Sequence, residues 1–413
     1  MSGMVWWGLA PAVLLLAVAA AELGARWWLR HRSAYYVFPP GQRIHLHPDP
    51  TVFPQLERLV RFEVNSQGER GREVPRGRGS SRLYRVLVAG GSQPEGYLLD
   101  QDTSWPGALQ RLLETPRHLQ RLKASAAHVG NIGRSGVGSE ALDLILERVL
   151  PRYPRLQAIV ILVGASDVIR WIEQGAPASR PAAVRTSDVF RCHREAPFAW
   201  RPGTSALAEL LRRLRQRWLR PLDLHANACN WVGRARAMRA RAAEVSTTMP
   251  DPTPMLEHFE LHFRRVLERA KLHADRVLVA RQSCFDKDYT PEEAAQMWHG
   301  GVGQPWREEV TTYYSFDIPS RLMALLDARA ARVADEVGVE QLDLTAVLEP
   351  SLETYWDWLH LTPAGARTVA DAIASVILRQ PRSFAVVDHL PVAVPEDPTP
   401  HLVTSRCVDS PAS

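Results

Sequence analysis

The stretch Val86-Leu87-Val88-Ala89-Gly90-Gly91-Ser92-Gln93-Pro94-Glu95-Gly96 decides the fold class of this chain. Its opening apolar residues predict a buried strand, and the Gly-Gly pair predicts the tight turn that ends it. Ser92 then lies at the carboxyl edge of a sheet, which is where open α/β sheets bind their ligands. Residues 105–113 predict the helix that follows. Taken alone, the stretch also fits an ordinary loop serine, so other segments must decide its role.

A carboxylate and an imidazole stand three residues apart near the other end of the chain, in Asp357-Trp358-Leu359-His360. A catalytic histidine needs a carboxylate that fixes its tautomer and orientation, and Asp357 is close enough in the chain to supply one to His360. Thr362 and Pro363 suit the cap and the first turn of a helix, which is predicted over 364–378. We therefore take Asp357 and His360 as the candidate partners of Ser92.

Two glycine-containing turns lie between these segments, at 131–136 and 164–167. Each follows an apolar run, so both turns are expected at the same sheet edge as Ser92. An ester hydrolase needs hydrogen-bond donors aimed at the developing oxyanion. The backbone N–H of Gly136 and the side chain of Ser166 are the candidate donors. Either turn alone also fits an ordinary glycine turn, and the hypothesis rests on the order and position of all the segments together.

The apolar runs predict a parallel sheet with helices on both faces, because strands and helices alternate along the chain. The expected strands lie near 84–89, 127–130, 158–163, 276–280 and 339–343. The expected organisation is a membrane anchor at 1–32, a lead-in segment at 33–80, a catalytic domain at 81–380 and a flexible Pro-rich tail at 381–413. A segment at about 170–255, with helical stretches at 205–219 and 232–245, predicts an insertion beside the Ser92 edge of the sheet.

Together these segments resemble the SGNH/GDSL hydrolase family, whose short blocks carry Ser, Gly, Asn and His in that order. Ser92 matches the nucleophile, Gly136 the oxyanion glycine, and Asp357 with His360 the family's D-x-x-H. The resemblance covers roughly 60–380 and implies a flavodoxin-like three-layer α/β/α sandwich. Residues 65–71 and 102–106 resemble segments of its membrane-anchored bacterial members.

The chain departs from the family pattern at two positions. Gly-Gly-Ser replaces the usual Gly-Asp-Ser, which is a mild change found in related bacterial branches. Ser166 stands where the family has its oxyanion asparagine, and a hydroxyl is shorter than an amide. Three outcomes are open: Ser166 donates directly, it acts through a water, or the oxyanion site is weak.

The resemblance implies a serine esterase that needs no cofactor and acts on O-acyl groups, with a cell-envelope glycan or lipid as the expected substrate. A polysaccharide O-acetyltransferase would use the same Ser92, Asp357 and His360. A degenerate, glycan-binding envelope protein is the alternative from another class. A dinucleotide-binding enzyme is disfavoured, because the stretch at 90–96 lacks the G-x-G-x-x-G spacing.

Residues 4–21 are nearly continuous apolar sequence, which approaches the length of a bilayer span. Tryptophans flank the run at positions 6, 7, 27 and 28, as at a membrane interface. We expect an uncleaved single-span anchor in an inner membrane, because no basic segment precedes the run as in a signal peptide. Arg26, Arg30 and Arg32 favour a cytoplasmic domain, whereas the resemblance favours an extracytoplasmic one, which we adopt.

The net charge of +5 comes almost entirely from arginine and does not indicate a nucleic-acid partner. The arginine-rich run at 212–220 fits either a solvated helix face or a site for an anionic partner or lipid headgroups. The cysteines, at 192, 229, 284 and 407, show no zinc-ligand spacing, so no metal is expected. Cys192 and Cys229 could pair. The glycine-rich segment 298–303 is expected to be a mobile loop. Its His299 is expected to be a structural histidine, with substrate binding as the alternative.

Overall fold

The computed structural model describes residues 4–32, 35–75, 82–181, 183–190, 205–218, 221–224 and 230–379 of the chain. At its centre is a five-stranded sheet with the order β10-β8-β5-β3-β4, and every neighbouring pair is parallel. The strands are β3 (Leu83–Gly90), β4 (Ala126–Asn131), β5 (Leu156–Leu162), β8 (Ala274–Arg281) and β10 (Glu340–Asp343). Numbered along the chain, this is the flavodoxin-like order 2-1-3-4-5. The predicted fold class and strands are confirmed.

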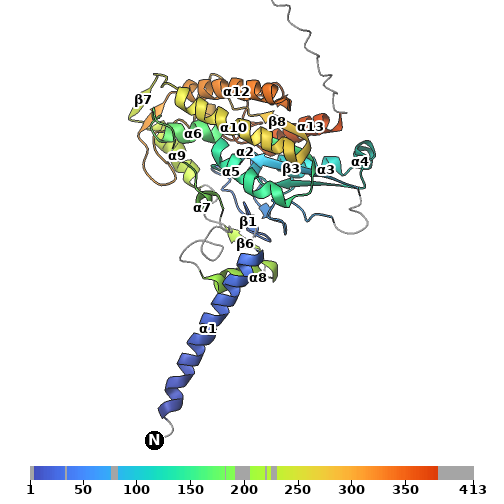
Figure 1. Ribbon diagram of the computed structural model, residues 1–413. Coiled ribbons are helices and arrows are strands. Elements are labelled where there is room, and N and C mark those ends of the chain that lie inside the picture. Colours follow the sequence, from blue (N-terminus) through green and yellow to red (C-terminus); the bar gives the residue numbers. More distant parts are fainter. Residues whose placement is uncertain are drawn as a thin grey trace, which may run out of the picture. The chain divides into compact units, whose positions relative to one another are not determined.

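Helices cover both faces of the sheet (Figure 1). Helices α5 (Ser139–Val149) and α12 (Asp317–Val337) pack against α10 (Thr253–His273), whereas α13 (Pro363–Leu378) packs against α3 (Trp105–Leu113). Because the central strands are buried on both sides, β3 and β5 contain continuous apolar runs, at 86–90 and 158–162, rather than alternating ones. The helices expected at 105–113 and 364–378 are therefore confirmed, and Thr362 caps α13 by accepting the Gly365 N–H at 3.2 Å.

Shorter elements surround this sandwich. The helices are α2 (Ser92–Glu95), α4 (Pro116–Leu122), α6 (Ala165–Glu173), α7 (Thr186–Val189), α8 (Ala206–Trp218), α9 (Asn230–Ala240) and α11 (Pro291–Ala294), with a 3-10 turn at Leu150–Arg152. One small sheet joins β1 (Arg43–Leu46), β2 (Val60–Glu63) and β6 (Leu222–Leu224), and another joins β7 (Glu244–Ser246) and β9 (Thr312–Tyr314). The predicted tail at 381–413 lies outside the described residues, as do Cys192, Cys229 and Cys407.

The helix expected at 232–245 is too long by several residues. Helix α9 ends at Ala240, and residues 244–246 form strand β7 instead. The backbone N–H groups of Ala243 and Glu244 both donate to the Thr311 carbonyl, and β7 then pairs with β9. Pairing with a distant segment thus overrides the helical propensity of this alanine- and arginine-rich stretch.

Helix α1 (Met4–Arg32) contains a segment, Pro11–Leu29, that is long and apolar enough to cross a membrane. This candidate span overlaps the apolar run at 4–21 that the sequence suggests. A signal sequence would satisfy the same criterion, and the side of the membrane on which the domain lies stays a prediction.

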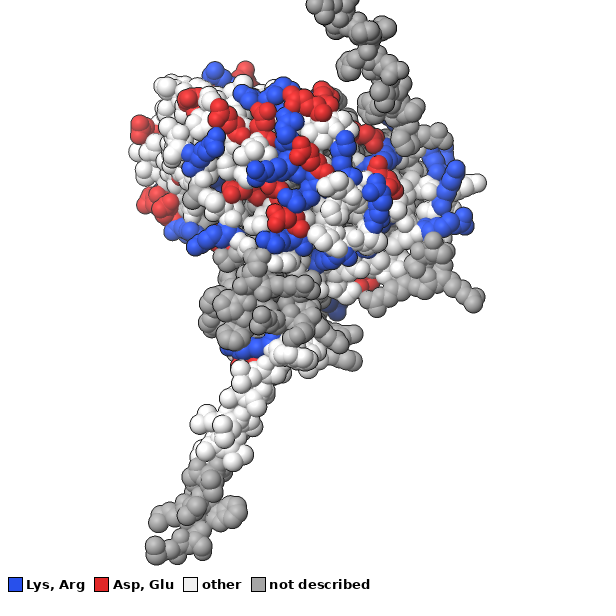
Figure 2. All heavy atoms as spheres, in the orientation of Figure 1, with Lys and Arg blue, Asp and Glu red and all other residues white. Residues whose placement is uncertain are grey.

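Charges of both signs are mixed on the face formed by α10 and α12 (Figure 2). Glu260 on α10 binds Arg329 at 2.7 Å and Arg332 at 2.6 Å, and both arginines belong to α12. Arg264 on α10 pairs in turn with Glu336 on α12. Because each arginine faces a carboxylate, the excess of basic residues produces no uniform positive field on this face.

Candidate functional site

Ser92 lies at the turn between β3 and the single-turn helix α2. Gly90 has φ +152°, and a Cβ there would lie 1.8 Å from the Leu162 carbonyl oxygen, so only glycine fits. The next N–H, of Gly91, donates to the same carbonyl at 3.1 Å. The Gly-Gly pair therefore turns the chain sharply at the carboxyl end of the strand, as predicted, and presents Ser92 at the sheet edge.

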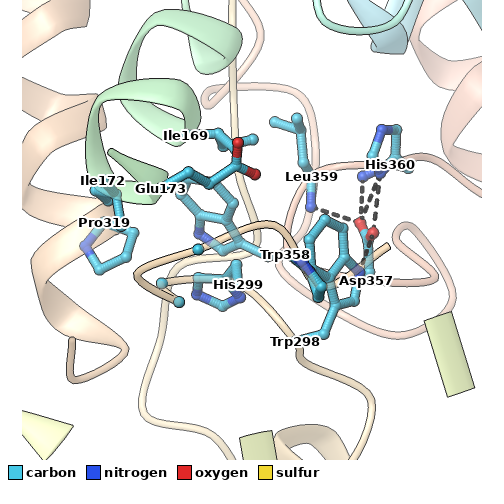
Figure 3. A pocket seen from close by; sticks show the side chains of 14 residues that line it. Ile169, Ile172, Glu173, Trp298, His299, Pro319, Asp357, Trp358, Leu359 and His360 are labelled. Carbon is cyan, nitrogen blue, oxygen red and sulfur yellow. Dashed lines mark hydrogen bonds and ion pairs between the residues drawn. The ribbon is translucent and has the colours of Figure 1, made fainter. Parts of the chain in front are cut away.

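Ser92, His360 and Asp357 form a continuous hydrogen-bonded chain. His360 Nε2 lies 2.8 Å from Ser92 Oγ, and its Nδ1 lies 2.9 Å from Asp357 Oδ2. Asp357 Oδ1 accepts the backbone N–H groups of Leu359 at 2.8 Å and His360 at 2.7 Å. Figure 3 shows these contacts around Asp357. The arrangement allows the imidazole to take the serine proton while the carboxylate holds its other nitrogen.

The electrostatics of the pair match that role. Burial alone would raise the pKa of Asp357, but His360 and the two backbone N–H groups outweigh it and lower that pKa. Burial opposes protonation of His360, yet the Asp357 carboxylate prevails and raises the pKa of the imidazole above its usual value. Asp357 therefore stays ionised, and His360 is a stronger base than a free histidine.

Two tryptophans, Trp298 from another segment and Trp356 from the same loop, hold the pair in place. Trp298 Nε1 donates to Asp357 Oδ2 at 3.0 Å. The ring of Trp356 stacks on the His360 imidazole, with centroids 4.9 Å apart and planes 11° from parallel. Arg236 donates to the Trp356 carbonyl at 3.0 Å and so fixes this loop from helix α9. Sequence reasoning missed all three residues.

The loop that follows Ser92 is held by the buried guanidinium of Arg70. Arg70 donates to the carbonyls of Glu95, Gly96 at 2.7 Å and Leu99 at 2.6 Å. Asn65 Oδ1 accepts the Glu69 N–H at 3.1 Å and shapes the turn that carries Arg70. The 65–71 segment, singled out by resemblance alone, thus supports the nucleophile loop, and Gln93 links that loop to the Leu359 carbonyl at 2.9 Å.

The two glycine-containing turns border the turn that carries Ser92. A Cβ on Gly91 would lie 3.5 Å from Ser166 Oγ and 3.3 Å from the Val137 carbonyl oxygen. Gly136 has φ +76°, and a Cβ there would meet nothing within 4 Å. The structure therefore brings Ser166 and the 134–137 turn to the nucleophile, as the sequence predicts, while their role as oxyanion donors stays a prediction.

Asp167 connects those two turns. Its carboxylate oxygens both accept the backbone N–H of Ser139, each at 3.0 Å, and Oδ1 also accepts the Ser139 hydroxyl at 2.7 Å. Burial raises the pKa of Asp167 to about 6. The first turn of α5 is thereby tied to the residue that follows Ser166, so Asp167 orients the loop rather than the substrate.

A cavity of about 1050 Å³ opens beside the serine. Its lining includes Ser92, Gly136, Ser166 and His360, together with Val184 from the expected insertion. Further lining residues, Arg134, Arg170, Arg185, Trp231, Trp306 and Trp356, are cationic or aromatic. All the predicted site residues except Asp357 therefore face one space that is large enough for a substrate of several sugar units or an acyl chain.

A second cavity, of about 30 Å³, is lined by Asp357, His360, Glu173 and His299 (Figure 3). His299 is buried, and neither ring nitrogen has a partner among the described residues. Its ring stacks on Trp358 at 4.5 Å, and burial lowers its pKa to about 3. His299 borders this small cavity and does not line the large one, which favours the structural interpretation over substrate binding.

Glu173 makes the stability of the fold pH-dependent. Burial raises its pKa to about 8, against the opposing charge of Arg170. The folded state therefore keeps a proton that the unfolded chain has lost, and stability falls as pH rises from about 4.5 to about 8, by at most about 1.4 kcal/mol per pH unit. We expect Glu173→Gln to raise the melting temperature relative to wild type at pH 8 but not at pH 5. Thermal melts of wild type and Glu173→Gln across this pH range test the expectation, with a substitution of the exposed Glu309, Glu309→Gln, as the control. A difference in melting temperature that does not change with pH would contradict the raised pKa of Glu173.

Solved structures of other proteins align with most of this chain at low sequence identity. No protein-family model and no curated protein matches the chain. An alpha/beta hydrolase enzyme from the metagenome of Lake Arreo, Spain, aligns with 72% of this chain and 97% of its own, at 12% identity and TM-score 0.39.

Two further solved structures align over a similar range. The acetylxylan esterase Axe2 from Geobacillus stearothermophilus aligns with 72% of this chain and 95% of its own, at 14% identity and TM-score 0.38. A member of the lipolytic protein G-D-S-L family from Veillonella parvula aligns with 72% of this chain and all of its own, at 10% identity and TM-score 0.39. Scores this low carry no argument, so the fold rests on the strand order of this chain and its function on its own site.

Proposed function

We propose that this protein is a serine esterase of the SGNH/GDSL type that cleaves carboxylic O-acyl esters through an acyl-enzyme. The observation that carries the proposal is the chain of contacts from Ser92 Oγ to His360 Nε2, at 2.8 Å, and from His360 Nδ1 to Asp357, at 2.9 Å. The polarised pair of Asp357 and His360 supports it further, since the imidazole is basic and the carboxylate ionised.

In the proposed reaction, His360 Nε2 takes the Ser92 proton as Oγ attacks the ester carbonyl. The N–H groups of Ser92 and Gly136, with the Ser166 hydroxyl, hold the oxyanion. The intermediate collapses, the C–O bond to the alcohol breaks, and His360 returns its proton to the leaving oxygen. Water then attacks the acyl-enzyme with His360 as base, which releases the carboxylic acid and restores Ser92.

The proposed substrate is an O-acylated cell-envelope glycan or lipid. The tryptophans and arginines that line the large cavity support a sugar-bearing or acidic ligand, because aromatic faces and guanidinium groups bind such surfaces. The candidate span in α1 supports action next to a membrane. We place the domain outside the cytoplasm, although Arg26, which follows the apolar run at 4–21, favours the opposite orientation. Protease treatment of intact cells tests this, with permeabilised cells as the control. A domain that is protected in intact cells would contradict the placement.

A fluorophosphonate probe tests the proposed nucleophile. We expect the full-length protein in detergent to be labelled on Ser92, and labelling to disappear in Ser92→Ala and to fall by about 10³-fold or more in His360→Ala. The control is Ser375→Ala, on the exposed side of α13. A folded wild type that takes no label would overturn the esterase and leave the degenerate, binding-only interpretation.

The Ser166 hydroxyl is expected to contribute to oxyanion binding. Ser166→Ala should lower kcat for a water-soluble acetyl ester by about 10- to 100-fold with little change in KM, less than the loss of an oxyanion amide, because the hydroxyl is shorter than the amide that the family has at this position. Steady-state kinetics with acetyl and longer acyl esters check it. A variant as fast as wild type would mean that the N–H groups of Ser92 and Gly136 suffice.

A further inference from the structure

Helices α5 and α10 bring a carboxylate and two imidazoles together away from the serine. Glu140 lies in the first turn of α5, and His258 and His262 lie one turn apart on α10, on the same side of the helix. Glu140 Oε2 is 3.3 Å from His258 Nε2, and the two imidazole rings lie 4.7 Å apart. One ligand atom from each of the three residues lies within 4.8 Å of the others.

We propose that Glu140, His258 and His262 bind a divalent transition-metal ion of the Zn²⁺ type. Imidazole nitrogen with carboxylate oxygen is the donor set that such ions prefer. A tetrahedral ion with bonds of about 2.0–2.1 Å holds its ligand atoms roughly 3.3–3.4 Å apart. The Glu140–His258 pair already has this separation, and the ligand atom of His262, which lies within 4.8 Å of the other two, must move closer to complete the site.

The residues around the cluster fit this role. Val184 N–H donates to Glu140 Oε1 at 3.0 Å, which fixes the carboxylate and leaves Oε2 for the ion. Asp143, one turn further along α5, faces His262 Nδ1 at 3.3 Å and Arg269 at 3.1 Å. A carboxylate hydrogen-bonded to a ligating histidine is the usual outer partner of a metal site, and it orients the ring.

Nearby positive charges limit the affinity of the site. The positive charge of Arg180 disfavours a second positive charge at His258. Arg265 and Arg269 lie 4.0 and 3.1 Å from the Asp143 carboxylate. Asp143 is therefore neutralised by arginine, and Glu140 is the single anionic ligand. We consequently expect Zn²⁺, which binds imidazole strongly, rather than Mg²⁺ or Ca²⁺, which need several oxygen ligands.

The proposed site borders the large cavity. Glu140 and His258 line that cavity together with Ser92 and His360. Three protein ligands leave a coordination position for water or for a substrate oxygen, such as a carboxylate or a hydroxyl. Glu140 also follows directly on the 136–139 segment, whose Ser139 is held by Asp167. A bound ion would thus connect α10 to the end of the segment that carries Gly136.

Zinc binding to the full-length protein, purified in detergent without a histidine tag and stripped with a chelator, tests the proposal. We expect one Zn²⁺ per chain by equilibrium dialysis and elemental analysis, and a melting temperature that rises with Zn²⁺. His258→Gln, His262→Gln and Glu140→Gln should each weaken binding by about 10- to 100-fold. His273→Gln, on the same helix, is the matched control, because His273 bonds the Arg269 carbonyl instead.

The test is independent of the esterase. Ser92→Ala should bind Zn²⁺ like wild type, so a failed nucleophile assignment leaves the metal site standing, and the reverse also holds. Co²⁺ provides a second readout, since a nitrogen- and oxygen-ligated tetrahedral ion absorbs visible light. Absence of stoichiometric Zn²⁺ in wild type would overturn the proposal. So would equal uptake by a folded His258→Gln, His262→Gln double variant, which would place the ion elsewhere.

Discussion

Asp357→Asn is expected to lower kcat for ester hydrolysis by about 10³- to 10⁴-fold while the protein stays folded. An amide keeps an oxygen for the N–H groups of Leu359 and His360, which Asp357 Oδ1 accepts at 2.8 and 2.7 Å. Its nitrogen, however, takes the place of Oδ2, so it donates to His360 Nδ1 and no longer accepts the Trp298 N–H. The imidazole proton then moves to Nε2, which can no longer accept the proton of Ser92.

The same substitution is expected to change the pH profile. Catalysis needs neutral His360, so wild-type kcat/KM should rise with pH through the pKa of His360, which Asp357 raises above 6.5. In Asp357→Asn the carboxylate charge is lost while the burial of His360 remains, so the pKa of His360 should fall. The acidic limb of the kcat/KM profile should therefore shift to lower pH. Kinetics from pH 5 to 9 check this, with the exposed Asp371→Asn as control. An acidic limb that stays in place would show that another group limits the rate.

The sequence predicts the site well where the signal is local. Ser92 is visible because an apolar run ends in Gly-Gly, and Asp357 and His360 because they share one loop before a capped helix. The strand order adds what no single motif contains, namely that the ends of β3, β4 and β5 and the Asp357–His360 loop meet at one edge. The parallel fold therefore explains why the candidate groups lie together, while their catalytic roles stay predictions that rest on the resemblance and on the contacts among them.

The residues that support the site could not be predicted from the sequence, for a different reason. Arg236 and Trp298 act on the Asp357–His360 loop from distant segments, and neither belongs to a recognisable motif. The segment that contains Arg70 was singled out by the resemblance, but the carbonyls that Arg70 binds were not. A single sequence contains no periodicity that reports such contacts. The cluster of Glu140, His258 and His262 was not predicted, because only the packing of α10 on α5 places Glu140 beside the two histidines.

Arg70→Met is expected to cost about 3–5 kcal/mol of unfolding free energy, the largest stability effect among the residues discussed. The guanidinium is buried and stacks on Phe62 at 4.5 Å. Methionine has a similar length but no donor, so the Glu95 and Leu99 carbonyls would lose their partner, at about 1–3 kcal/mol for each one left unsatisfied. The Gly96 carbonyl would keep the Leu99 N–H, which it accepts at 2.8 Å. Urea unfolding of the full-length protein measures the loss.

The exposed neighbour Arg72 offers the matched control. Its side chain is 51% exposed and pairs with Glu114 at 3.0 Å, so Arg72→Met should change stability by less than about 1 kcal/mol. Arg70→Lys separates charge from geometry, since a lysine keeps the charge but cannot fork between carbonyls. If the Arg70→Lys protein folds, its loss of kcat/KM, expressed as a free energy of activation, should exceed its loss of unfolding free energy. The reason is that Gly96 and Leu99 line the cavity beside Ser92. An Arg70→Met protein as stable as Arg72→Met would mean that water replaces the guanidinium and that the loop after the nucleophile needs no buried cation.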